Sequence, residues 1–561
     1  MLWTYDKVWQ KSEFNEDGTG KTDIYYLFES KAVGVRSIPF TYTTSNDGML
    51  TVKNDEDENA TTTRYEVSGS ELKLISDDTQ MVMKKMDATM ANNFDKWSKE
   101  KNLMPVPKPA KYTVFVYGNA GGDMDFIIEN GLWEPMKSLL KDHDNVRVIC
   151  MYKYGYKTDS HGTDGDIVFF ELTDSLDINN IQKEGFKMEG FGNLAMRMKL
   201  CSPATVNMFM QLSSLKCPAE QYVFAIWGHG NGLTPMTDIP GKNSDMSSAQ
   251  SGTRGVIADE WNNKEELNMY ELADAIRQTG IKRLNTIFFH NCLMGNIETL
   301  TDLRGLSDYI TASAHLLESG GEILAEYIRG LYETGNTEDA FKQMMNTCYD
   351  EWAKSHISLK TNTDSTKTTE YMNGDYKLIR TDKLDGIIEA AGQLSERIIA
   401  LYPTQKDAID AATRKVYRFA KATLPDFLAN WKADGVMAPF FDLGDYAHKL
   451  AEETKDSRFE AIAKEMDKAF DEAFVYYADV NQNEQHLDHY TLSVCLAEKT
   501  DYTFDYLSDY FSQLVYKPLC NFNTGYEQCT FHKLTGWGNW MNINQQKLTD
   551  NPRSGGGGPL Y

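Results

Sequence analysis

Two apolar segments of the sequence each end at a side chain that could take part in chemistry. AIWGHGNG spans residues 225–232 and contains His229, and IFFHNCLMG spans residues 287–295 and contains Cys292. A thiol that attacks an amide needs a nearby imidazole, which acts as general base or pairs with the thiolate and later protonates the leaving amine. The types of these two residues therefore indicate nucleophilic catalysis by a cysteine and a histidine.

Both segments have the composition of buried strands in a parallel sheet, where continuous apolar runs are covered on both faces. Ligands bind beyond the carboxyl ends of such strands, so we expect His229 and Cys292 at the same edge of one sheet. The glycines around the histidine allow a sharp turn and a close approach of backbone to ligand. We expect the N–H groups of Gly230 and Cys292 to stabilise an oxyanion. A helix that begins after Gly295 would favour a thiolate at Cys292.

Strand-like and helical segments alternate around these motifs. Buried-strand patterns occur in YTVFVYGNA, VRVICMYKYG and YITASAHL, and helical spacing occurs in GLWEPMKSLLKDH, LNMYELADAIRQTG and NIETLTDLRGL. This alternation predicts an α/β fold with a mostly parallel sheet and helices on both faces. We assign residues 110–335 to this core, residues 336–545 to a mostly helical part that returns to the sheet, and the Gly-rich residues 546–561 to a loose tail.

The N-terminal region has a different pattern. Short segments rich in Thr, Tyr, Val and Leu are separated by the turn signals Asp17-Gly18, Asp47-Gly48 and Ser68-Gly69. This spacing predicts a small all-β domain over residues 1–87 that closes into a barrel or a sandwich. The polar residues 88–109 are expected to be a linker, which the prolines of MPVPKPAK keep extended.

Composition and charge restrict the class of protein further. The chain has 561 residues, of which 41% are hydrophobic and 25% charged, so we expect a globular protein of several domains. Its net charge of −25 repels nucleic acid and anionic membranes and attracts cationic peptides or calcium. No apolar run approaches the roughly 20 residues of a membrane span, and the start MLWTYDKVWQ does not read as a signal peptide.

The eight cysteines are scattered, without a CxxC pair or metal-ligand spacing. We therefore expect no disulfide scaffold, at most one bridge among the cysteines other than Cys292, and we assign no metal ligand.

The motifs YVFAIWGHGNG and IFFHNCLMGNIET, with histidine before cysteine, resemble those of the clostripain family of cysteine peptidases, relatives of caspases and gingipains. Similar matches, in KYTVFVYGNAGGDMDF, DYITASAHLLESGGEI, FFDLGDYAHKL and TGWGNWM, extend the resemblance over about residues 110–545. It implies a caspase-like sheet and a dyad of Cys292 and His229. The implied activity is that of an endopeptidase that forms a thioester on the cysteine and acts on peptides or proteins.

The resemblance also implies a location and, for some relatives, an ion. Relatives of this type are exported, so we expect a secreted protein or one of the bacterial cell envelope, and calcium is the only cofactor that the family suggests. At the N-terminus, LWTYDKVW and DGTG resemble lipocalin-like modules. The number of subunits is not predicted.

The sequence departs from the family pattern two residues before the nucleophile, where the family usually has Asp and this chain has His290. Residues two apart on a strand point the same way, so we expect His290 to line the substrate site beside Cys292. In the family that Asp helps to bind a basic P1 side chain, and a histidine would hold Arg or Lys less well. Glu318 or Glu322 could supply a carboxylate instead, and His290 is an alternative to His229 as the base.

Two further questions are left open by the sequence: whether the chain cuts itself, and whether it is catalytic at all. Many family members cut themselves between the histidine and the cysteine, and the polar stretch IPGKNSDMSSAQSGTRGV there contains Lys242 and Arg254 as its basic residues. Cleavage after Lys242 is one expectation and an intact loop is the other. Against the peptidase, we weigh a catalytically retired scaffold that binds a ligand or an envelope partner.

Overall fold

A computed structural model describes most of the chain. The described residues are 7–28, 31–54, 60–76, 79–85, 109–119, 128–137, 139–140, 145–153, 167–176, 199–228, 230, 232, 257–259, 265–314, 322–348, 376–417, 419, 440–477, 492–496, 526 and 529–550. They form two compact units. One comprises Met1–Ala110, Asn207–Glu220 and Arg277–Lys282, and the other comprises Lys111–Val206, Gln221–Ile276 and Arg283–Tyr561.

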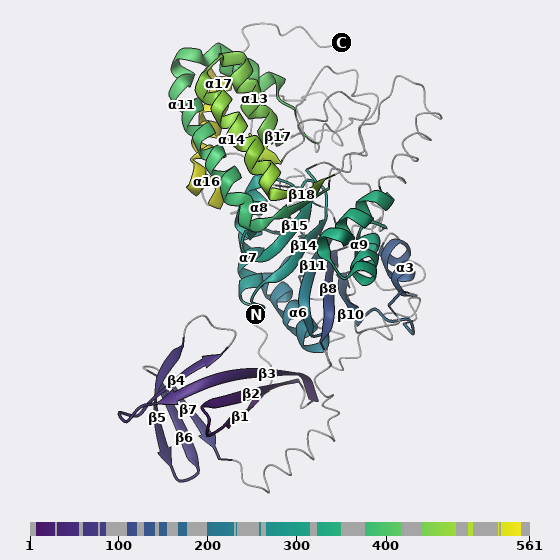
Figure 1. Cartoon of the computed structure of the whole chain (residues 1–561), viewed down its shortest axis with the longest axis vertical. Coiled ribbons are helices and arrows are strands. Elements are labelled where there is room, and N and C mark those ends of the chain that lie inside the picture. Colours follow the sequence, from purple (N-terminus) through teal and green to yellow (C-terminus); the bar gives the residue numbers. More distant parts are fainter. Residues whose placement is uncertain are drawn as a thin grey trace, which may run out of the picture. The chain divides into compact units, whose positions relative to one another are not determined.

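The N-terminal strands form one antiparallel sheet of seven strands in sequence order (Figure 1). They are β1 (Lys7–Phe14), β2 (Thr19–Phe28), β3 (Lys31–Thr44), β4 (Met49–Asn54), β5 (Thr61–Ser68), β6 (Glu71–Ser76) and β7 (Thr79–Lys84). Gly18, Gly48 and Gly69 all adopt positive φ, so the three predicted turns are confirmed. Strands β1 and β7 are the two edges, so the sheet is a half-barrel and the expected barrel does not close within the described residues.

The second sheet has eight strands and belongs to the α/β part. Its order is β10 (Ile167–Glu171), β9 (Val146–Lys153), β8 (Ala110–Asn119), β11 (Ala219–Trp227), β14 (Leu284–His290), β15 (Ser307–Ala312), β16 (Lys377–Arg380) and β18 (Phe474–Tyr477). The pairs β8–β9, β11–β14 and β14–β15 are parallel, whereas β9–β10, β15–β16 and β16–β18 are antiparallel. The predicted mostly parallel centre is therefore confirmed, with antiparallel strands at both edges.

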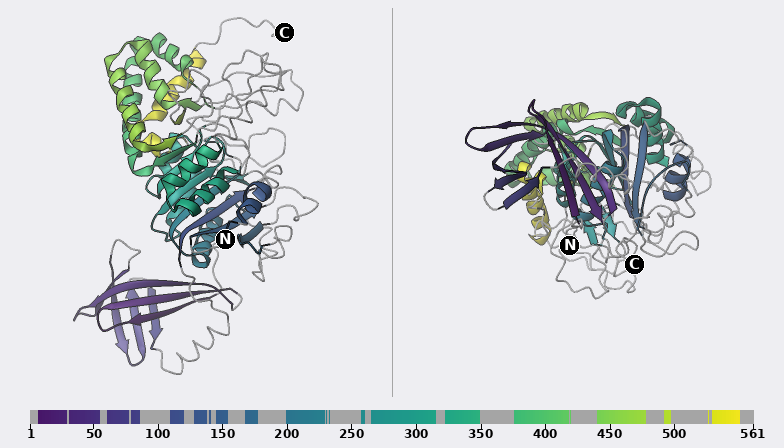
Figure 2. Two further views of the ribbon diagram at one scale, coloured as in Figure 1. Left: turned by 45° about the vertical axis from the view of Figure 1, so that its right-hand side comes forward. Right: turned by 90° about the horizontal axis from the view of Figure 1, so that it is seen from below.

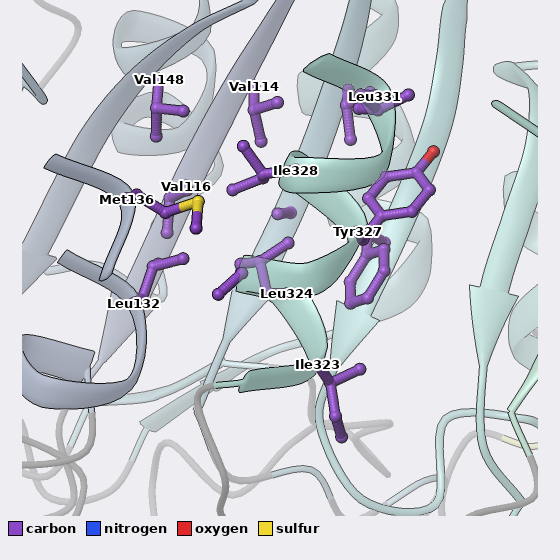
Figure 3. Packing of buried hydrophobic residues seen from close by; sticks show 14 of the residues in the cluster. Val114, Val116, Leu132, Met136, Val148, Ile323, Leu324, Tyr327, Ile328 and Leu331 are labelled. Carbon is purple, nitrogen blue, oxygen red and sulfur yellow. The ribbon is translucent and has the colours of Figure 1, made fainter. Parts of the chain in front are cut away.

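Helices cover this sheet on both faces (Figures 1 and 2). One face carries α9 (Glu322–Thr334), the π-helical turn η1 (Glu129–Trp133) and α3 (Glu134–Lys137). Their side chains pack on the strands, as Figure 3 shows for Leu324 and Ile328 of α9 against Val114 and Val116 of β8. The other face carries α7 (Met269–Arg277) and α8 (Ile297–Leu303), which connect the parallel strands β11, β14 and β15. The continuous apolar runs of the sequence are thus explained by a sheet that is buried on both sides.

The C-terminal part is largely helical, as predicted. Its helices are η4 (Thr381–Lys383), α11 (Leu384–Lys415), α13 (Leu443–Thr454), α14 (Ser457–Ala473), α16 (Thr530–Thr535) and α17 (Trp537–Asp550). Helix α11 contacts α13, α14, α16 and α17, and α16 contacts α8. The strand that returns to the large sheet is β18, beside β16. Strand β19 (Ser493–Cys495) does not join this sheet and pairs with β17 (Phe440–Asp442).

Further described elements are the short strands β12 (Ile257–Asp259) and β13 (Glu265–Leu267) and the 14-residue helix α6 (Pro203–Lys216), and residues 337–348 are also helical. In the part of the chain that the structure describes, no helix combines the length and apolar character needed to cross a membrane.

Candidate active site

The two strands that carry the chemical motifs end side by side. In the parallel pair β11–β14, Trp227 is the partner of His290, and these are the last residues of the two strands. Beyond them, the N–H of Gly228 donates to the carbonyl of His290 at 3.4 Å, and the side-chain amide of Asn291 donates to the carbonyl of Gly228 at 3.0 Å. The two strands therefore end at one edge of a single sheet, as expected, and the place of His229 itself stays a prediction.

The glycine-rich segment after β11 lies directly against the segment after β14. A Cβ atom on Gly230 would lie 2.3 Å from the carbonyl oxygen of Cys292 and 2.7 Å from Cβ of Asn291. A Cβ on Gly232, whose φ is +60°, would lie 3.0 Å from the carbonyl oxygen of Leu293. Real Cβ contacts are longer than these, so glycine at residue 230 is required by the closeness of the two backbones and not by a turn.

Cys292 differs from the other described cysteines. It keeps its thiol and is partly exposed, whereas the other thiols in the described ranges are buried: Cys150, Cys201, Cys217, Cys348 and Cys529. Cys495 is disulfide-bonded, in agreement with the expectation of at most one bridge. A partly exposed cysteine just beyond the carboxyl end of a central parallel strand lies where such sheets bind their ligands.

The turn after Cys292 is strained and well supported. Leu293 adopts a left-handed φ of +62°, which is uncommon for a residue with a side chain and costs about 1–3 kcal/mol. The side-chain amide of Asn296 donates to the carbonyl of Leu293 at 3.0 Å, and its oxygen accepts from the N–H of Thr299 at 2.8 Å. Asn296 thereby fixes the turn and is the N-cap of α8. The helix expected after Gly295 begins at Ile297.

Gly295 attaches the same turn to the next strand. Its N–H donates to the carbonyl of Ser313 at 2.7 Å, just beyond β15. A Cβ on Gly295 would lie 2.6 Å from the backbone nitrogen of Ala314. The turn that presents Cys292 is therefore held between the ends of β11 and β15.

His290 is a buried, neutral aromatic side chain in this structure. It is 3% exposed and stacks on Trp227, with ring centroids 4.0 Å apart and an interplanar angle of 22°. Burial disfavours the imidazolium and lowers the pKa of His290 to about 3. Its Nδ1 and the Nε1 of Trp227 have no hydrogen-bond partner among the described residues. Since β14 ends at His290, the alternation of strand side chains does not extend to Cys292, and the role of His290 in the substrate site stays a prediction.

Several residues predicted for the site lie outside the described residues: His229, Lys242, Arg254 and Glu318. Glu322 is the first residue of α9, and its side chain is also outside them. Their roles therefore stay predictions. Within the described ranges, no group of three or more His, Cys, Asp or Glu side chains is arranged to hold a metal ion.

The sequence reasoning missed residues that shape the site without reacting. Asn296 had a recognisable signal, because an Asn directly before the apolar helical run IETLTDL is a typical N-cap. The left-handed Leu293 and the stack of Trp227 on His290 had none, since both depend on how two distant segments meet.

The sheet has a partly exposed cysteine just beyond the carboxyl end of a central strand, beside a glycine-rich segment, and a cysteine in such a place can act as a nucleophile. The model of the clostripain family, Peptidase_C11, matches residues 116–534, and the chain belongs to this family. The family resemblance of the sequence motifs is therefore confirmed. The lipocalin-like character of the N-terminal sheet remains a prediction.

Several solved structures are similar to this chain. A secreted C11 cysteine protease from Bacteroides thetaiotaomicron with an irreversible peptide inhibitor is 14% identical, with a TM-score of 0.46 over 77% of this chain and 100% of that chain. An inactive zymogen C11 protease from Parabacteroides distasonis is 16% identical, with a TM-score of 0.46 over 77% of this chain and 99% of that chain. None of the curated proteins matches the sequence.

Replacing Gly230 by alanine should disturb the site directly, because the added methyl group would overlap the carbonyl oxygen of Cys292. We expect Gly230→Ala to change the rate at which iodoacetamide alkylates Cys292 by about fivefold or more. Gly305→Ala is the matched control, since Gly305 has a φ of +79° but open space around its Cβ position. The control should lose stability and keep the alkylation rate, and equal rates in both variants would contradict the packing described above.

His290 should make the stability of the fold depend on pH. Its pKa is about 3 in the folded chain and about 6.5 when unfolded, so between these values the unfolded state binds more protons. The stabilisation is therefore complete above about pH 6.5 and is lost as the pH falls toward 3. His290→Phe keeps a ring against Trp227, and its free energy of unfolding in urea should decrease less on acidification. Parallel pH curves for the two proteins would exclude a buried neutral imidazole.

Proposed function

We propose that the protein is a cysteine endopeptidase in which Cys292 is the nucleophile and His229 the general base. The observation that carries this proposal is the packing of Gly230 on the backbone of Cys292 and on Cβ of Asn291. Gly228 and Gly230, which flank His229 in the sequence, both lie against residues 290–292. Family membership over residues 116–534 supports the same chemistry.

In the proposed reaction, the sulfur of Cys292 attacks the carbonyl carbon of the scissile peptide bond. His229 takes the thiol proton and returns it to the leaving amine, so that the C–N bond breaks and a thioester forms on the cysteine. Water then attacks the thioester with His229 again acting as base, which releases the carboxylic acid and restores the thiol. The partial exposure of Cys292 gives substrate and water access to the sulfur.

The backbone N–H groups of Gly230 and Cys292 are the proposed oxyanion donors. The nitrogen of Cys292 lies 3.1 Å from the point that a Cβ of residue 230 would occupy, so the two amides belong to one small region. Fixed donors of this kind stabilise the charge that develops on the carbonyl oxygen, and loss of one typically costs about 3 kcal/mol of barrier.

We also propose that the enzyme does not depend on a basic P1 side chain. Residue 290 precedes the nucleophile by two positions, and a neutral, buried imidazole supplies no negative charge to pair with Arg or Lys. The imidazole is instead stacked on Trp227, and both rings are buried. Neutral P1 side chains should therefore be accepted at least as well as basic ones.

Export from the cell is part of the same proposal. Cys495 is disulfide-bonded, and structural disulfides persist in oxidising compartments such as the periplasm and the extracellular space. Peptides or proteins in that compartment would then be the substrates.

The reaction is tested with a fluorogenic peptide library. Cys292→Ala should lower kcat by about four orders of magnitude or more, because the nucleophile is lost. His229→Ala should lower kcat almost as much as Cys292→Ala does. The kcat of His290→Ala should stay within about tenfold of that of the parent protein, since only His229 acts as base. Cys201→Ala, which removes a buried thiol, is the control. Activity that survives Cys292→Ala would refute Cys292 as the nucleophile, and a parent protein without activity would leave a non-catalytic scaffold as the function.

The P1 proposal has its own variants. His290→Asp should raise kcat/KM for Arg and Lys relative to neutral P1 residues by about tenfold or more, because a buried carboxylate gains most from a cationic side chain. His290→Asn, which is neutral and of similar size, should leave the ratio unchanged. Strong cleavage only after Arg or Lys by the parent protein would refute the proposed preference.

A further inference from the structure

A strand from the C-terminal part lies against the turn that presents Cys292. Ser493, the first residue of β19, donates its N–H to the carbonyl of Gly295 at 3.0 Å. Ser493 also forms an isolated parallel β-bridge with Asn296. The backbone of residues 292–296, which we call the nucleophile turn, is therefore hydrogen-bonded to a strand about 200 residues later in the sequence.

A buried carboxylate connects β19 to helix α8, which follows the same turn. Glu298 is 0% exposed, and its Oε1 accepts a hydrogen bond from the N–H of Cys495 at 2.8 Å and another from the hydroxyl of Tyr526 at 2.8 Å. Burial of a carboxylate is costly unless donors surround it. A glutamate in this place is therefore explained by the donors that it holds and not by packing alone.

On its other side, β19 is held by groups that do not belong to the nucleophile turn. Its residue Val494 pairs with Phe441 of β17. The carbonyl of Cys495 accepts from the indole N–H of Trp537 at 2.8 Å, and the side chain of Cys495 is in a disulfide. The strand is thus fixed to the C-terminal part. Ser493 binds the turn directly, and Glu298 binds β19 to the helix that follows the turn.

We propose that Glu298 is a positioning residue, which acts through β19 to hold the turn that presents Cys292. Loss of its contact to the N–H of Cys495 would loosen β19 from α8 and weaken the hydrogen bond between Ser493 and Gly295. The left-handed conformation of Leu293 would then lose support on one side, and the thiol would shift relative to Gly230. Strained backbone of this kind persists only where its surroundings hold it.

The test compares two variants of the full chain. Glu298→Ala should lower kcat about tenfold with KM within about twofold, because the thiol is misplaced while substrate contacts remain. It should also slow the alkylation of Cys292 by iodoacetamide by about fivefold. Glu298→Gln keeps the carbonyl oxygen that both donors need, so kcat and the alkylation rate should stay within about twofold of the parent. Amide hydrogen exchange of a peptide that covers residues 492–496 should rise in Glu298→Ala alone.

Glu338→Ala is the matched control. The carboxylate of Glu338 accepts from the hydroxyl of Tyr309 at 2.9 Å and from the guanidinium of Arg380 at 3.1 Å. Glu338 lies in a helix, and its two donors lie in β15 and β16. Its loss should affect stability and leave the alkylation of Cys292 unchanged. A folded Glu298→Ala with native kcat and native alkylation would overturn the proposal. A Glu298→Gln variant as impaired as Glu298→Ala would also overturn it, because the negative charge of Glu298 and not its hydrogen bonds to β19 would then determine the activity.

A third variant covers the case in which Glu298→Ala does not fold. Tyr526→Phe removes one of the two donors and keeps the ring, and it should slow alkylation of Cys292 about threefold. An unchanged rate in this variant would count against the proposal. The expected change in kcat rests on the proposed function, but the alkylation rate of Cys292 can be measured without peptidase activity. A parent protein that cleaves nothing would therefore refute the function, while the alkylation rates would still decide the role of Glu298.

Discussion

The candidate site depends on one steric constraint, the close approach of the backbone at Gly230 to the backbone of Cys292 and to Cβ of Asn291. The two segments approach so closely that any side chain at residue 230 would overlap the carbonyl oxygen of the cysteine. The parallel pairing of β11 with β14 produces this contact, because it ends both strands at the same level. All the chemistry that we propose requires the two loops to stay in this register.

The electrostatic character of the site follows from burial. A histidine packed flat on Trp227, with almost no exposure, cannot keep a proton at neutral pH, because water no longer solvates the charge. An aspartate in the same place would carry a negative charge into the site and would need a cation to pair with it. The residue type at position 290 therefore decides whether this buried place is neutral or charged, and our proposal on the P1 side chain rests on that difference.

The turn of residues 293–296 that follows Cys292 is held by parts of the chain that are distant in sequence. Its own residues supply the strained Leu293 and the capping Asn296, β15 is followed by the carbonyl that binds Gly295, and β19 supplies the N–H of Ser493. The C-terminal helices and the disulfide-bonded strand are therefore part of the support of the site. Strand β19 lies within residues 116–534, which the family model matches.

The sequence alone determined the class of fold, the two motifs and their common sheet edge, because continuous apolar runs and the glycines after them report local burial and turning. It also gave the turns at Gly18, Gly48 and Gly69, which need only neighbouring residues. The tertiary structure decided that Gly230 must lack a side chain, that His290 is neutral and that Glu298 binds Cys495. Each of these depends on which distant segment lies beside the residue, and no pattern within a short stretch of sequence contains that information.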